Sequence, residues 1–202
     1  MLANYTWINN ITVGTPYCDF AFADDSHCLA RHRALPFPAI SVEGEDPAIV
    51  AQLADALIST SRLPPDQPFY SLVPERIATI LTAATDVLSV QPEWQMLCDG
   101  KPTQLTPGCA RPLELSDLPA MAQLAHIADA MVFNADTFAR GEFFGVDCDG
   151  ELVAMGGVQT KLPGFGEIGS IVTHPAHRRR GYAGQVVAAL VHHLQSQGQQ
   201  VF

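Results

Sequence analysis

The chain has 202 residues, which is enough for one large domain or two small ones. Hydrophobic residues make up 48% and charged residues 16%, a balance that supports a buried core and excludes a disordered chain. The formal net charge is −10, with 21 acidic against 11 basic residues. This charge argues against a nucleic-acid or membrane-surface binder, because no general basic field would attract phosphate, and it favours a cationic or amine-bearing partner.

The cysteines and the N-terminus indicate the compartment. The five cysteines are odd in number and lack close metal spacing such as C-x-x-C, so we expect reduced thiols and no metal site. Residues 1–14 contain no Lys or Arg and no apolar core, unlike a secretory signal. No apolar run approaches the roughly 18 residues that span a bilayer. The sequence therefore predicts a soluble cytoplasmic protein.

The first half alternates helical patterns with proline-rich connections. Asp46 offers an N-cap, Pro47 suits the first helical position, and apolar residues then recur at helical spacing. A second helix is expected to begin at Pro74, with its apolar residues on one face. Short strands are expected at residues 86–90 and 93–98.

Residues 99–108 are dense in turn-forming residues and predict a boundary between domains 1–107 and 108–202. The patterns after this boundary predict a strand, a helix, three strands, a helix and the start of another strand. Asp149 and Gly150 form a strong two-residue hairpin signal between the second and third of these strands. The expected elements are a strand at 110–115, a helix after 116, strands at 142–148, 151–158 and 167–172, a helix at 181–197 and a strand from 200.

The turn before the last helix has the features of an anion site. Three of the eleven basic residues stand there in a row: Arg178, Arg179 and Arg180. Three small residues follow: Gly181, Ala183 and Gly184. Small residues let an anion approach the backbone, the helix N-terminus adds a positive dipole, and arginines add charge-assisted hydrogen bonds. The alternative is a solvated helix start in which Gly181 serves packing.

The pattern Arg178-x-x-Gly181-x-Ala183, within residues 167–183, resembles the coenzyme A pyrophosphate loop of the GNAT superfamily of N-acetyltransferases. It is similar to a bacterial branch that carries Thr-His-Pro before the Arg-rich loop. Residues 111–121 resemble the first strand and helix of that branch, and residues 145–157 resemble its central hairpin. The resemblance covers about residues 108–202 and implies an α/β fold, with a GNAT-like mixed sheet flanked by helices.

The first half shows a fainter resemblance to the N-terminal portion of the same branch. It is carried by Trp7–Asn10 and Trp94–Met96. The implied arrangement is a smaller, degenerate GNAT-like α/β half that precedes the working one. A purely structural domain is the alternative.

The resemblance assigns roles to the residues around the turn. Backbone hydrogen bonds to the pantetheine arm are expected from Ile171, Val172 and Thr173. The pyrophosphate is expected at Arg178, Arg179, Arg180, Gly181, Tyr182, Ala183 and Gly184. His174 and His177 stand in the tight turn itself, and this place favours capping or packing of the turn over a catalytic role.

Glu167 matches the position of the general base in some GNAT enzymes. An amine must lose a proton before it attacks the thioester of acetyl-coenzyme A (acetyl-CoA), and a carboxylate can accept that proton. An ionisable residue in an otherwise apolar strand also favours a raised pKa. The alternatives are an anchor that holds the substrate amine by its charge, and a surface carboxylate at a strand end.

The family fold normally continues into a helix whose Tyr is commonly proposed as the general acid, whereas this sequence ends at Phe202. We therefore expect a chain that is incomplete at its C-terminus, either as a fragment or as a natural shortened form; the alternative is that the first half fills the missing space. Tyr182 is expected to belong to the anion site. The leading hypothesis is an N-acyltransferase that transfers an acetyl group from acetyl-CoA to a primary amine of a small molecule or peptide. The alternative is a non-catalytic acyl-CoA-binding module or sensor. An unpaired last strand would be an open edge, so a homodimer is a further alternative.

Overall fold

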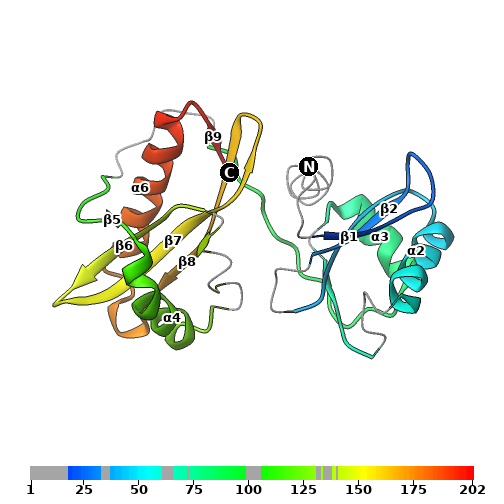
Figure 1. Cartoon of the computed structure of the whole chain (residues 1–202), viewed down its shortest axis with the longest axis horizontal. Helices are drawn as coiled ribbons and strands as arrows, with labels where there is room; N and C mark the ends of the chain where they lie inside the picture. Colours follow the sequence, from blue (N-terminus) through cyan, green and yellow to red (C-terminus); the bar gives the residue numbers. More distant parts are fainter. Residues whose placement is uncertain are drawn as a thin grey trace. The chain divides into compact units, whose positions relative to one another are not determined.

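The computed structural model describes residues 18–32, 37–60, 66–71, 73–98, 106–130, 133, 138–139 and 141–202. The chain folds as two compact units, Met1–Gln95 and Met96–Phe202 (Figure 1). The boundary expected after residue 107 falls inside the second unit, because Cys98 already forms an antiparallel bridge with Val201. None of the described helices combines the length and the apolar character that crossing a bilayer requires.

The first unit is built on a four-stranded sheet of order β1-β2-β3-β4. Its elements are β1 (Cys18–Phe22), β2 (Cys28–His32), β3 (Ala39–Glu43), α2 (Pro47–Ser59), β4 (Tyr70–Ser71) and α3 (Glu75–Ala84). The first three strands are antiparallel neighbours, whereas β4 runs parallel to β3. Two parallel neighbouring strands need a crossover connection, and α2 lies in the crossover between β3 and β4.

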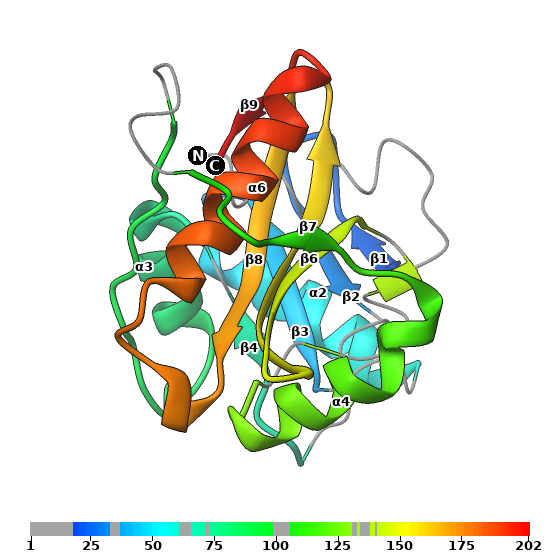
Figure 2. The same cartoon turned by 90° about the vertical axis from the view of Figure 1, so that its left-hand side faces the viewer.

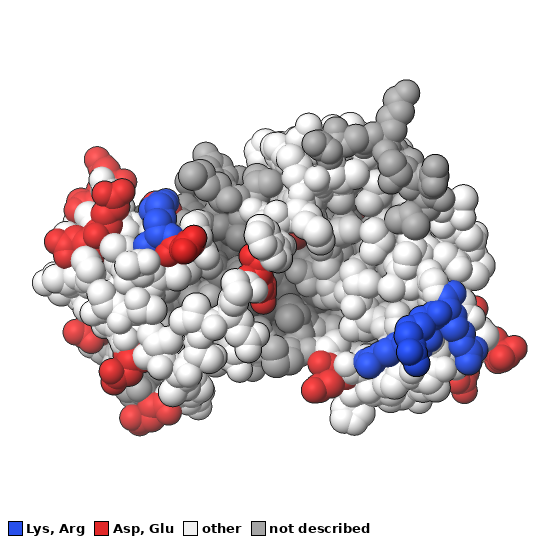
Figure 3. Space-filling model, turned by 180° about the vertical axis from the view of Figure 1, so that it is seen from behind, with Lys and Arg blue, Asp and Glu red and all other residues white. Residues whose placement is uncertain are grey.

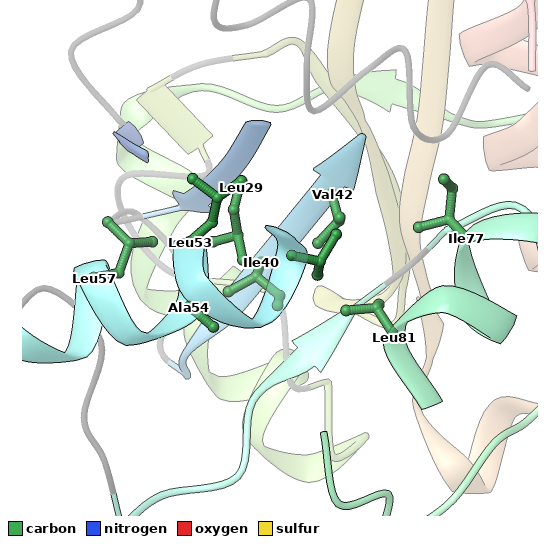
Figure 4. Packing of buried hydrophobic residues seen from close by; sticks show 9 residues of the cluster. Leu29, Ile40, Val42, Leu53, Ala54, Leu57, Ile77 and Leu81 are labelled. Atoms are coloured by element: carbon green, nitrogen blue, oxygen red, sulfur yellow. The ribbon is translucent and has the colours of Figure 1, made fainter. Parts of the chain in front are cut away.

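One apolar cluster forms the core of the first unit (Figure 4). Leu29 and Ile40 point from the strands toward Leu53 of α2, and Ile77 of α3 belongs to the same cluster. Asp46 accepts a hydrogen bond from the Ala48 N–H at 2.8 Å and so caps α2. Both helices expected in this half are confirmed.

The strands expected at residues 86–90 and 93–98 are wrong. Residues 85–97 form no strand, and only Cys98 enters a bridge. Leu88 is 84% exposed and Trp94 is 90% exposed, so the apolar side chains of this segment are not buried within the described structure. A strand-like pattern becomes a strand only where a partner surface covers its apolar face, since strand preference depends strongly on context.

The second unit is a five-stranded sheet of order β5-β6-β7-β8-β9. Its elements are β5 (Arg111–Pro112), η1 (Leu115–Asp117), α4 (Leu118–Ile127), β6 (Phe143–Cys148), β7 (Glu151–Leu162), β8 (Phe165–Thr173), η2 (Pro175–His177), α6 (Tyr182–Ser196) and β9 (Gln200–Val201). Strands β5 to β8 are antiparallel, and β9 runs parallel to β8 after the crossover helix α6. The predicted order of elements and the mixed α/β class are confirmed.

Helices α4 and α6 cover opposite faces of this sheet. Neighbouring residues of a strand point to opposite faces. Met155 of β7 packs in one cluster with Met121 of α4, whereas a Cβ on Gly156 would lie 3.4 Å from Leu190 of α6. Figure 2 shows α6 running along β8, the strand that leads into it.

The packing of α6 can be tested with a matched pair of substitutions. Leu190 is fully buried, so Leu190→Ala should lower the free energy of unfolding by about 2–5 kcal/mol through lost burial and a cavity. Urea titration followed by circular dichroism measures this loss. Leu115 is 73% exposed, and Leu115→Ala should change the free energy by less than about 0.5 kcal/mol. Equal losses in the two variants would contradict the assignment of Leu190 to the core.

Candidate functional site

A pocket of about 400 Å³ lies where β8 passes into α6. Eight of the ten residues expected to bind the coenzyme line it: Ile171, Val172, Thr173, Arg178, Arg179, Gly181, Tyr182 and Ala183. His177 and Ala128 complete the lining. Arg180, Gly184 and Glu167 are not part of this wall. The structure therefore gathers most of the expected cofactor residues around one hollow, while Glu167 lies outside it.

Local hydrogen bonds fix the turn between β8 and α6. His174 Nδ1 accepts a hydrogen bond from the Ala176 N–H at 3.1 Å and caps η2, so the capping role expected for His174 is confirmed. The Nε of Arg178 donates to the Thr173 carbonyl at 3.2 Å. This bond ties the start of the Arg-rich segment back to the end of the strand.

Two residues of the turn have left-handed backbone conformations. Gly181 has a φ of +84°, which glycine adopts without steric cost. Arg179 has a φ of +62°, a conformation that a non-glycine residue keeps only where its surroundings impose it, often at a functional site. Gly181 precedes α6, and no side chain of the described residues caps that N-terminus. The N–H groups of the first turn of α6 are therefore available to an anion.

The pocket is basic at its entrance. Arg178, Arg179 and Arg180 are all exposed, and none of them takes part in the ion pairs formed among the described residues. Figure 3 shows a compact patch of basic side chains on one face of the molecule. Guanidinium groups without a carboxylate partner can offer their remaining donors to a ligand such as a phosphate.

The hairpin between β6 and β7 also contacts the pocket wall. The hydroxyl of Tyr182 donates to Cys148 Sγ at 3.6 Å, and this bond raises the pKa of Tyr182. The two residues are 34 positions apart, so no local pattern indicates their contact. The bond holds the Tyr182 ring against the hairpin.

The edge of β8 beside the pocket is open. Strand β9 pairs only with the first two residues of β8, and no described strand lies on that side of residues 169–173. The His174 N–H donates to the Val153 carbonyl of β7. The N–H and C=O groups of successive residues in a strand point alternately to its two neighbours. Because His174 points its N–H toward β7, Thr173 and Ile171 point their N–H and C=O groups toward the open edge of β8.

Glu167 lies on the same strand as the pocket. It precedes Ile171 by four positions, which corresponds to about 13 Å along a strand. Glu167 is paired with Thr160 of β7, whose side chain hydrogen-bonds to the carboxyl group. Burial raises the pKa of Glu167, and the bond from Thr160 opposes this shift without cancelling it.

A second polar pair lies next to Glu167 and is absent from the sequence prediction. Gln159 Nε2 donates to Ser170 Oγ at 2.8 Å, where the register of the β7–β8 ladder shifts and Ser170 takes a φ of +52°. A Cβ on Gly169 would lie 2.5 Å from the Gln159 side chain, so Gln159 lies over that face of β8. Glu167 precedes Gly169 by two residues and shares the face. Ile168 packs in the cluster with α6, so the polar groups lie on the opposite face.

These features combine an uncapped helix start flanked by arginines, an open strand edge and a half-buried carboxyl group along one strand. Among the described residues, no group of three or more His, Cys, Asp and Glu side chains is placed to hold a metal ion. The arrangement suits a ligand with a phosphate group at one end and a reacting group near Glu167 at the other.

Known proteins share this fold. The model of the FR47-like protein family matches residues 145–202, which include most of β6 and all of β7, β8, α6 and β9. No curated protein matches the sequence. A solved structure from Novosphingobium aromaticivorans, assigned to the GNAT acetyltransferases, is 23% identical with a TM-score of 0.70, over 99% of this chain and 83% of that one.

Two further structures agree. A GCN5-related N-acetyltransferase from Kribbella flavida is 15% identical with a TM-score of 0.62, over 99% of this chain and 84% of that one. A GCN5-related N-acetyltransferase-like protein from Streptococcus suis is 12% identical with a TM-score of 0.58, over 100% of this chain and 81% of that one. The expected relation to the GNAT superfamily is confirmed at the level of the fold. The Thr-His-Pro branch stays a prediction.

The environment of Glu167 predicts a pH-dependent stability difference. Its folded-state pKa is raised above the unfolded value, so the ionised side chain costs folding free energy at neutral pH. Glu167→Gln removes this cost and should melt at a higher temperature than the wild type above the raised pKa. The advantage should vanish as the pH falls below about 4, where Glu is protonated in both states.

Thermal melts across this pH range measure the difference, and Glu151→Gln, at an exposed position of β7, is the control. A stability gain in Glu167→Gln that is the same at every pH would contradict the raised pKa.

Proposed function

From a chain with the GNAT fold, whose residues 145–202 match the FR47-like family, we propose an N-acyltransferase that moves an acetyl group from acetyl-CoA to a primary amine. The observation that carries the proposal is the pocket between β8 and α6, with its uncapped helix N-terminus and three arginines that form no ion pair among the described residues. The fold supports acyl transfer in general, and the pocket supports a coenzyme with phosphate groups.

The residues of the pocket fit coenzyme A in two parts. The N–H groups that open α6, together with Arg178, Arg179 and Arg180, would hold the pyrophosphate. The backbone of Ile171 and Thr173, at the open edge of β8, would bind the amides of the pantetheine arm. When bound, acetyl-CoA supplies an activated acyl carbonyl, and an arm extended along β8 directs it toward Glu167.

Glu167 would accept the proton of the acceptor. An amine is mostly ammonium near neutral pH, so a base must remove a proton before attack. The raised pKa of Glu167 makes this carboxylate a stronger base than an ordinary surface Glu. The net charge of −10 favours a cationic acceptor, either a small molecule or a peptide amine.

One observation favours the second candidate, an acyl-CoA-binding module without turnover. Tyr182 is the tyrosine described in the second unit, and its hydroxyl contacts Cys148 rather than Glu167. The described part of this unit therefore supplies no tyrosine as general acid beside Glu167. Binding and turnover experiments separate the two functions.

Binding depends on the turn arginines. Arg179→Ala should raise the Kd for coenzyme A about 10-fold or more, because hydrogen bonds to charged groups contribute about 1.5–3 kcal/mol. Isothermal titration calorimetry measures the Kd. Arg76→Ala is the matched control, since Arg76 lies in the first unit and pairs with Glu43 at 2.7 Å. Equal Kd values for the two variants would place the coenzyme elsewhere.

Turnover depends on Glu167. Glu167→Gln should lower kcat about 10²–10⁴-fold, the usual contribution of a general base, while the Kd for coenzyme A stays within about twofold. Release of free thiol from acetyl-CoA across a panel of amines measures kcat. Glu151→Gln should react like the wild type. Coenzyme binding without thiol release in the wild type would support the binding module, and full activity in Glu167→Gln would rule out its role as base.

A further inference from the structure

The first unit repeats the strand and helix order that builds the pocket of the second unit. In the second unit three antiparallel strands, β6 to β8, are followed by α6 and by β9, which is parallel to β8. In the first unit three antiparallel strands, β1 to β3, are followed by α2 and by β4, which is parallel to β3. The turn at residues 44–46 therefore corresponds to the anion-binding turn at residues 174–181.

A histidine side chain occupies this turn in the first unit. His27 Nε2 accepts hydrogen bonds from the Glu45 N–H at 3.4 Å and the Asp46 N–H at 3.3 Å. His27 Nδ1 lies 2.9 Å from Asp24 Oδ1, so the network assigns the ring hydrogen to Nδ1 and leaves Nε2 as an acceptor. The His27 side chain is only 13% exposed.

The turn has no room or charge for a phosphate. A Cβ on Gly44, which has a φ of +141°, would lie 2.5 Å from the His27 ring, so the ring sits directly on the backbone. The Asp46 side chain takes the Ala48 N–H at 2.8 Å. Glu45 and Asp46 also place negative charge where the second unit carries three arginines. The N–H groups of Glu45, Asp46 and Ala48 are therefore already bonded, and the neighbouring carboxylates would repel an anion.

The neighbouring strand explains the difference between the two turns. The register of the β2–β3 ladder places His27 opposite Gly44, the first residue of the turn. In the second unit the first turn residue is His174, and the residue opposite it is Val153, whose carbonyl accepts the His174 N–H. The Val153 side chain belongs to the apolar cluster with α6 and offers no acceptor to the turn. The N-terminus of α6 therefore stays free.

We infer that the first unit is a closed copy of the anion-binding unit, in which His27 takes the place of a ligand phosphate, and that the chain binds coenzyme A only through its second unit. The claim that coenzyme A binds through the second unit rests on the proposed function. The claim that His27 occupies the turn of the first unit is independent of that function and is tested separately.

The role of His27 is tested by stability and hydrogen exchange. His27→Ala should lower the melting temperature by about 5 °C or more, as expected for the loss of about one helix cap in a domain of this size. Amide exchange at Glu45 and Asp46 should become at least about 10-fold faster. His27→Gln keeps a side-chain acceptor and should show a smaller loss.

His192→Ala, at an exposed position of α6, is the matched control and should leave melting and exchange unchanged. Wild-type melting and exchange in His27→Ala would overturn the inference. If the variant does not fold, slow exchange of Glu45 and Asp46 in the wild type supports the inference, and fast exchange opposes it.

The single coenzyme site is tested by calorimetry and by NMR titration of the intact chain. We expect one coenzyme A per chain, with amide shifts at residues 178–184 and none at Glu45 and Asp46. Two coenzymes per chain, or shifts at Glu45 and Asp46, would overturn the inference. An absence of any binding would refute the proposed function, and the melting and exchange results would still decide the role of His27.

Discussion

The first N–H groups of a helix have no hydrogen-bond partners within the helix. The candidate site depends on these groups at the start of α6, where no described side chain bonds to them. At α2, Asp46 and His27 satisfy these groups from within the protein. At α6, Gly181 takes a left-handed backbone conformation at the N-cap position and has no side chain to cap the helix. Three arginines directly precede it, next to the N–H groups of the first turn. The same strand and helix order thus produces a helix start that is capped from within the protein in one unit and a helix start without a side-chain cap in the other.

The β7–β8 ladder connects this anion-binding end to the carboxyl end of the site. A regular ladder would continue β8 without interruption, but its register shifts near the Gln159–Ser170 pair, and Ser170 takes a left-handed φ. Such a conformation costs about 1–3 kcal/mol and persists only where neighbours fix it. The Gln159 hydrogen bond supplies one such constraint. Thr160, the next residue of β7, bonds to Glu167, so adjacent residues hold both features in place.

The sequence predicts those parts of the fold that local signals determine. The two helices of the first half, the hairpin at Asp149 and the Arg-rich turn all depend on residues close in the chain. The strands expected at residues 86–90 and 93–98 do not form. Their apolar side chains would need a partner surface to cover them, and the local sequence pattern does not tell whether such a surface exists. The pairs Gln159–Ser170 and Thr160–Glu167, and the contact of His27 with the α2 turn, join separate strands or turns, so only the ladder register reveals them. The faint resemblance of the first half implied a repeated topology, and the strand pairing is needed to show which strands and turns correspond.

The range of electrostatic forces reconciles an acidic chain with an anionic coenzyme. A net charge of −10 would repel a phosphate group at long range, yet charges in physiological salt are screened over about 8 Å. Within that distance, the N-terminus of α6 and the exposed arginines would attract a phosphate in the pocket directly. The acidic residues elsewhere then impose little cost on coenzyme binding. Near Glu167 the burial that raises its pKa also weakens screening, which strengthens the attraction for a cationic amine. Two opposite charge preferences therefore fit on one strand, because the six positions from Glu167 to Thr173, about 20 Å of β8, separate the carboxyl group from the Arg-rich turn.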